Sequence, residues 1–149
     1  MSNVHTSATT AIGVNDGSSP PSPENRENVS PLAFTPVGKV EDAGEFGGEA
    51  NIQDFTPLDT GIVEKVSGSI NRGDMQLSIG ASKNDPGHAI LEAAFESRQP
   101  IYVEVDMPDG TGGREVDYLK AIVSSYRKAI GTADDIIKIN VNLAISAVY

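Results

Sequence analysis

The sequence contains no cysteine and no tryptophan, and only two of its 149 residues are histidine. Without cysteine there is no disulfide framework, no thiolate metal site and no cysteine nucleophile, which suits a reducing compartment. His5 and His88 are not spaced as a pair of metal ligands, so we interpret each as a lone surface histidine. We therefore expect no metal ion and no cofactor.

Basic residues are scarce. The chain has 11 Lys and Arg against 21 Asp and Glu, a net charge of −10. This sign opposes nucleic-acid binding, because affinity for phosphate comes from Lys and Arg that release counterions. Long apolar runs are also missing: none approaches the roughly 20 residues of a membrane span, and the N-terminus lacks the apolar core of a signal peptide. We expect a soluble protein without membrane contact.

Catalytic motifs are equally absent. The stretch PDGTGG, residues 108–113, lacks the Lys-Ser/Thr pair and the helix start of a phosphate-binding loop, so we interpret it as a hairpin turn. Glu104 and Asp106 share one face of an expected strand, which is more typical of a solvated face than of an acid/base pair. There is no Gly-x-Ser-x-Gly elbow. A structural or binding role is therefore favoured over an enzyme.

Residues 1–30 are rich in Ser, Thr, Asn and Pro and offer little that could be buried. We interpret them as a flexible N-terminal arm, which is either a solvated tail or a segment that orders on a neighbouring subunit. Residues 31–149 form the expected folded domain. Its first stretch is strand-like, and Pro36 confines that strand to an edge or a bulge.

Residues 41–61 contain six acidic residues and no basic one. A loop of this length is unusual inside a compact domain unless it is functional, so we predict an acidic assembly loop that folds onto a partner. The residues expected to contact a neighbouring subunit or ring are Glu41, Asp42, Glu45, Phe46, Glu49, Ile52, Asp54, Phe55, Leu58 and Asp59.

The rest of the chain alternates between apolar and polar residues with period two in most places. Residues 63–80 predict a hairpin of two short strands joined at Asn71–Asp74, and residues 101–107 predict the next strand. Residues 114–130 have a mixed pattern that we interpret as a strand with a bulge near 119–121. Residues 137–149 alternate strictly, which predicts a strand long enough to need several neighbours.

One stretch has helical character. Asn84 or Asp85 is suited to cap a helix with Pro86 in its first position, and the helix is expected to end near Ser97, before Pro100. Its apolar stripe, expected to pack against a sheet, consists of Ile90, Leu91, Ala94 and Phe95.

The order of these elements from Val37 to Tyr149 resembles the major tail tube proteins of long-tailed, siphovirus-like bacteriophages. No single motif is diagnostic; the likeness rests on the ordered set. The matching stretches are the acidic loop ending IQDFTPLDTG, the hairpin VEKVSGSINRGDMQLSIG, the Asp-Pro-Gly-led helix NDPGHAILEAAFES, the strand and turn PIYVEVDMPDG, and the closing hairpin AIVSSYRKAIGTADDIIKINVNLAIS.

The resemblance implies a mainly β fold: an antiparallel β-sandwich or partial barrel flanked by one α-helix. It implies homo-hexameric rings stacked into a hollow tube in the virion tail, made in the host cytoplasm, through which DNA is ejected. The implied partners are the tape measure, tail terminator and tail tip or baseplate proteins. DNA would pass without specific binding, since an acidic wall repels phosphate.

Alternation along the polar strand faces suggests which residues face such a lumen. These are Ser67, Ser69, Asn71, Asn140 and Asn142. Two alternatives remain open. One is the tube protein of a contractile injection system or type six secretion machine, and the other is a ligand-binding β-sandwich, which the shortage of aromatic side chains disfavours.

Overall fold

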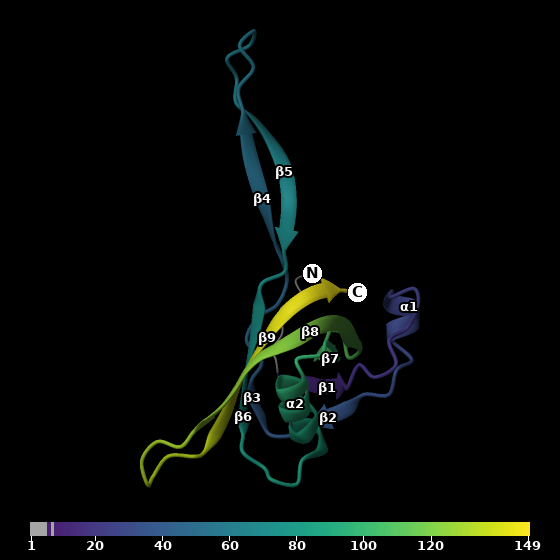
Figure 1. Ribbon diagram of the computed structural model, residues 1–149, viewed down its shortest axis with the longest axis vertical. Helices are drawn as coiled ribbons and strands as arrows, with labels where there is room; N and C mark the ends of the chain where they lie inside the picture. The colour runs from purple at the N-terminus through teal and green to yellow at the C-terminus, as the bar shows by residue number, and fades with distance from the viewer. Residues whose placement is uncertain (1–5, 7) are drawn as a thin grey trace.

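The computed structural model describes residue 6 and residues 8–149 (Figure 1). Among the described residues, strand makes up 48% and helix 11%, which confirms the mainly β prediction. The strands are β1 (Ala11–Asn15), β2 (Thr35–Val37), β3 (Val40–Asp42), β4 (Glu49–Phe55), β5 (Glu64–Asn71), β6 (Asp74–Gly80), β7 (Ile101–Pro108), β8 (Arg114–Ala129) and β9 (Lys138–Val148). The helices are α1 (Arg26–Val29) and α2 (Pro86–Ser97).

Seven strands form one antiparallel sheet in the order β2-β1-β7-β8-β9-β6-β3. The two edge strands, β2 and β3, are joined by Gly38 and Lys39 alone. A connection this short holds the two edges close together, so the sheet curls into a nearly closed barrel. This confirms the expected partial barrel, with Pro36 in an edge strand as predicted.

The barrel interior is built by strict alternation on its longest strands. Met75, Leu77 and Ile79 of β6 lie directly across from Leu143, Val141 and Ile139 of β9, and all six side chains are buried. Burial of each such side chain contributes about 1.5–3 kcal/mol. The strand predicted from the period of two is therefore confirmed as β9.

Strand β8 is long because it serves two neighbours. Residues 114–121 pair with β7, and residues 119–129 pair with β9. The register with β9 shifts between Lys120 and Ala121 and again between Val123 and Ser125. The first shift confirms the predicted bulge, and such bulges let a long strand bend around the barrel.

Helix α2 has the predicted bounds. Asp85 caps it by accepting from the backbone N–H of Gly87 and His88, and Arg98 ends it in the left-handed conformation at φ 58°. The helix contacts β1, β2 and β8. Its expected stripe is confirmed, since Leu91 and Ala94 are buried in the barrel core while Ile90 and Phe95 pack against that core half-buried.

The start of α2 also fastens the connection between the two edge strands. Gly38 donates its N–H to Asp85 Oδ2 at 2.9 Å, and His88 Nε2 donates to the Gly38 carbonyl at 2.8 Å. His88 is only 3% exposed, so the prediction of a surface histidine is wrong. The imidazole ring is buried because its Nε2 satisfies the backbone carbonyl of Gly38 in the β2–β3 connection.

The predicted flexible arm is a second point of difference. Strand β1 lies inside the sheet between β2 and β7, with Ile12 and Val14 buried, and α1 follows at residues 26–29. The prediction is therefore wrong for residues 11–15, which are ordered by pairing with β7, and for residues 26–29, where Val29 is buried against Tyr102 and Tyr118. Residues 1–5 and 7, including His5, lie outside the described residues.

The pairing predicted for residues 63–80 is also wrong. Strand β5 pairs with β4 in a separate two-stranded sheet, whereas β6 pairs with β9 and β3. The Arg72–Gly73 step, with Gly73 at φ 72°, passes the chain from one sheet to the other. Consequently the predicted loop 41–61 consists of β3, a short connection, and the first strand and tip of a hairpin.

Candidate assembly surfaces

The β4–β5 hairpin stands away from the barrel along the longest axis of the molecule (Figure 1). Every residue of both strands is exposed, so neither face of this ribbon is covered by the rest of the chain. An isolated two-stranded hairpin is marginally stable in water. The hairpin is therefore the part of the described structure that would gain most from a partner.

Large apolar side chains lie on both faces of this hairpin. Ile52 is paired with Ser67 and Gln53 with Val66, so Ile52 and Val66 point to opposite faces. Seven apolar residues of the hairpin are at least half exposed, from 50% for Ile52 to 104% for Leu58. They are Ile52, Phe55, Leu58, Ile62, Val63, Val66 and Ile70. Apolar exposure on this scale is typical of an interaction site.

The residues predicted to contact a partner are distributed over three places. The edge strand β3 contains Glu41 and Asp42, and the connection after it contains Glu45 and Phe46. Strand β4 contains Glu49, Ile52, Asp54 and Phe55, and the hairpin tip contains Leu58 and Asp59. Phe46 packs half-buried against the barrel core. Glu41 pairs with Lys138 at 2.7 Å, and Asp54 pairs with Lys65 at 3.3 Å. The remaining acidic side chains of this set keep the hairpin and its approach negative.

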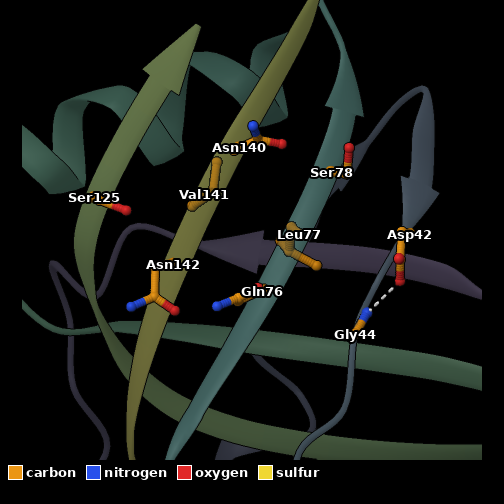
Figure 2. Close-up of a pocket in the computed structure, with 9 residues that line it drawn as sticks. All are labelled: Asp42, Gly44, Gln76, Leu77, Ser78, Ser125, Asn140, Val141 and Asn142. Carbon is orange, nitrogen blue, oxygen red and sulfur yellow. Dashed lines mark hydrogen bonds between the residues drawn. The ribbon is translucent and has the colours of Figure 1, made fainter. Parts of the chain in front are cut away.

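A second surface is the polar face of β6 and β9, shown in Figure 2. Gln76 lies across from Asn142, and Ser78 lies across from Asn140. These side chains line a shallow groove of about 410 Å³ together with Ser125 and the Asp42–Gly44 segment, in which Asp42 Oδ1 accepts the Gly44 N–H at 2.8 Å. Apart from Asp42 this groove carries no charge.

The predicted lumen-facing residues do not share one surface. Asn140 and Asn142 lie on the polar β6–β9 face, whereas Ser67, Ser69 and Asn71 lie on β5 in the projecting hairpin. Asn142 is held in place because its Nδ2 donates to Ser124 Oγ at 2.9 Å. That any of these residues faces a lumen stays a prediction.

The N-terminal strap, residues 24–34, is a feature that sequence patterns did not reveal. The Glu24 carboxylate accepts hydrogen bonds from Lys120 Nζ (2.9 Å), Tyr149 Oη (2.9 Å) and Tyr102 Oη (3.0 Å). The bonds from Lys120 and Tyr149 lower the pKa of Glu24. Burial, aided by Glu24, raises the pKa of Tyr102 to about 12 and also raises that of Tyr149.

Arg26 and Val29 complete the attachment of the strap. The Arg26 guanidinium donates to the Val116 and Tyr149 carbonyls at 2.6 and 3.2 Å and lies 5.3 Å from the centre of the Tyr118 ring. Val29 is fully buried in a small second core with Tyr102 and Tyr118. The strap therefore covers the outer face of β7 and β8, leaving the hairpin and the β6–β9 face uncovered.

Other kinds of site find no support in the part of the chain that the structure describes. Within residues 6 and 8–149, no three His, Asp or Glu side chains gather in a way that could hold a metal ion. None of the helices in these same residues has the length and apolar character required to cross a membrane.

No protein-family model matches the sequence, and no curated protein matches it. Among solved structures, the chain is similar to a chain in the cryo-EM structure of the anti-feeding prophage baseplate, 6-fold symmetrised. The TM-score is 0.71 over 100% of this chain and 96% of that chain, at 10% identity. The two chains share a fold. A crystal structure of Hcp protein is also similar, at 12% identity over 91% of this chain and 86% of that one, but with a TM-score of only 0.39.

Proposed function

We propose that this protein is a structural, non-catalytic subunit of the tube or baseplate of a contractile injection system. The observation that carries the proposal is the end-to-end fold likeness to a baseplate chain from a six-fold symmetrised particle. By analogy, copies of this chain would form six-membered rings within such a particle. Their partners would be further copies and the neighbouring tube or baseplate proteins.

The uncovered hairpin supports an assembling role. A monomer that stayed alone would leave seven large apolar side chains in water on a ribbon with no core of its own. Assembly removes that exposure, and each fully covered side chain of this size contributes about 1.5–3 kcal/mol to association. The acidic assembly residues predicted from the sequence belong largely to the same projection.

We favour assignment to a contractile injection system over assignment to the siphovirus tail tube that the sequence suggests. Both readings fit a barrel with a projecting segment, but the fold likeness is to a prophage baseplate chain. Passage of DNA and the tape-measure and terminator partners therefore stay with the alternative, a long-tailed phage tube.

Negative-stain microscopy of the purified protein, combined with analytical ultracentrifugation, tests the proposal. We expect six-fold rings or stacks of rings at high protein concentration. A species that stays monomeric at all concentrations, and when mixed with the other tube and baseplate proteins of its own particle, would argue against the proposal.

A further inference from the structure

A groove of about 500 Å³ lies between the start of α2, the C-terminal end of β8 and the N-terminal end of β9. Its walls include Lys83 and His88 from one side and Tyr126, Lys128 and Ile137 from the other. Ile137 is 47% exposed, and Ile130, which also lines the groove, is 65% exposed. The groove is therefore an apolar recess that the described chain leaves open.

The charges around this groove differ from those of the protein as a whole. Lys83 and Lys128 both line it, and Glu92 is the single acidic side chain among the lining residues. The net charge of the chain, by contrast, is −10. An apolar recess with a basic rim selects a partner segment that is apolar in the middle and acidic at its edges.

The tip of the β4–β5 hairpin has that composition. Between β4 and β5 the chain turns at Pro57–Gly61, where the Gly61 N–H donates to the Pro57 carbonyl at 2.9 Å. Leu58 and Ile62 project from this turn with 104% and 68% exposure. Asp59 lies in the turn and Glu64 begins β5, and neither is within salt-bridge distance of a basic group in the described residues.

The two surfaces lie at opposite ends of the molecule. The hairpin tip occupies one end of the longest axis, and the β8–β9 connection with the start of α2 lies toward the other (Figure 1). The tip of one copy is thus directed away from its own groove, so a tip that fills the groove has to come from another copy. A contact of this head-to-tail kind repeats along an axis and does not close into a dimer.

We propose that the hairpin tip of one copy docks into the α2–β8–β9 groove of the next copy along the particle axis. Leu58 and Ile62 fill the apolar recess, and Asp59 and Glu64 lie against Lys83 and Lys128. This assignment rests on the proposed function, because it supplies the contact between successive rings.

Charge reversal on each side provides the first test. The groove variant carries Lys83→Glu and Lys128→Glu, and the tip variant carries Asp59→Lys and Glu64→Lys. Each alone is expected to raise the concentration needed for assembly by roughly tenfold or more, because like charges then meet. A mixture of the two variants, and a chain carrying all four changes, should assemble again. Loss of assembly in either variant without this rescue would overturn the pairing.

Disulfide cross-linking provides the second test, because the chain has no cysteine of its own. A Leu58→Cys chain mixed with an Ile130→Cys chain should form a mixed dimer under mild oxidation. The matched control replaces Ile130→Cys by Glu115→Cys, which is also exposed but lies beside the β7–β8 turn. Cross-linking that favours Glu115, or occurs equally at both positions, contradicts the proposed groove.

These outcomes separate the two proposals. If rings or stacks form but the Leu58→Cys and Ile130→Cys chains form no disulfide, the docking site is wrong while the structural role stands. If the unmodified protein forms no assembly and the two cysteine variants form no disulfide, both proposals are overturned.

Discussion

The Glu24 carboxylate lies 2.9 Å from the ammonium nitrogen of Lys120, although 96 residues separate them in the chain. Two tyrosine hydroxyls from β7 and the chain end donate to the same carboxylate. This contact fastens the N-terminal strap across β7 and β8. The strap covers the outer face of the barrel on that side. The surfaces that stay uncovered are the hairpin and the β6–β9 face.

Replacement of Glu24 should release the strap while leaving the barrel folded. In Glu24→Ala the Lys120 ammonium and both tyrosine hydroxyls lose a shared acceptor, so the strap, residues 24–34, should be cleaved severalfold faster in limited proteolysis. Glu27→Ala is the matched control, because Glu27 is an exposed glutamate in the same segment. Equal cleavage rates for the two variants would show that Glu24 does not hold the strap.

The same cluster predicts how stability depends on pH. The pKa of Glu24 is lowered from 4.5, chiefly by the Lys120 hydrogen bond, so its contribution is fully present above about pH 4.5 and is lost as pH falls further. The pKa of Tyr102 is raised from 10.0 to about 12, so its contribution is complete below pH 10.0 and is lost between 10.0 and about 12. Urea unfolding of the wild type and Glu24→Gln across this range is the measurement. The difference between them should shrink below pH 4.5, and a constant difference would contradict the assignment.

The helix stripe makes a graded prediction about the core. Leu91 is 0% exposed within the main core, so Leu91→Ala should lower the free energy of unfolding by about 2–5 kcal/mol. Phe95 is only half-buried, so Phe95→Ala should cost less than the 3–5 kcal/mol typical of a fully buried phenylalanine. Urea titration of both variants checks the order. A larger loss at Phe95 than at Leu91 would mean that the helix packs differently.

Gly44 makes a local prediction about the edge of the barrel. It has φ 65°, and a Cβ added there would lie 2.6 Å from the Gln76 carbonyl oxygen. Gly44→Ala should therefore destabilise the protein by about 1–3 kcal/mol and loosen the β3 edge. Gly47→Ala is a useful comparison, because a Cβ there has open space although its φ of 158° is also unusual. Hydrogen exchange at β3 amides should rise only in the Gly44 variant.

Sequence reasoning succeeded where one local pattern decides the structure. Strand β9 alternates strictly, and α2 has a capping Asp85 followed by Pro86, so both could be placed before any tertiary contact was known. It failed where pairing is non-local. Strand β1 is five residues long and gains its order from β7, about 90 residues further along the chain.

The assembly surface formed by the hairpin was predicted only in part, because strand pairing is decided by residues far apart in the sequence. The composition of 41–61 predicted a segment that folds onto a partner, and the structure leaves Ile52, Phe55 and Leu58 exposed there, but turn chemistry at Arg72–Gly73 suggested the wrong partner for β5. The Pro57–Gly61 turn was the signal that could have placed the hairpin. The Glu24 cluster had no sequence signal, because its members are drawn together only by the completed fold.

The proposed structural role depends most on the β4–β5 hairpin, which can be deleted without removing any strand of the barrel. Glu49 and Asn71 are paired across its base, so Asn-Gly in place of residues 50–70 should close the strands with a two-residue turn. Sedimentation velocity and negative-stain microscopy of this variant beside the wild type are the decisive measurement. We expect a variant with native circular dichroism that stays monomeric while the wild type forms rings or stacks; assembly of the variant to the same extent as the wild type would contradict the structural role of the hairpin.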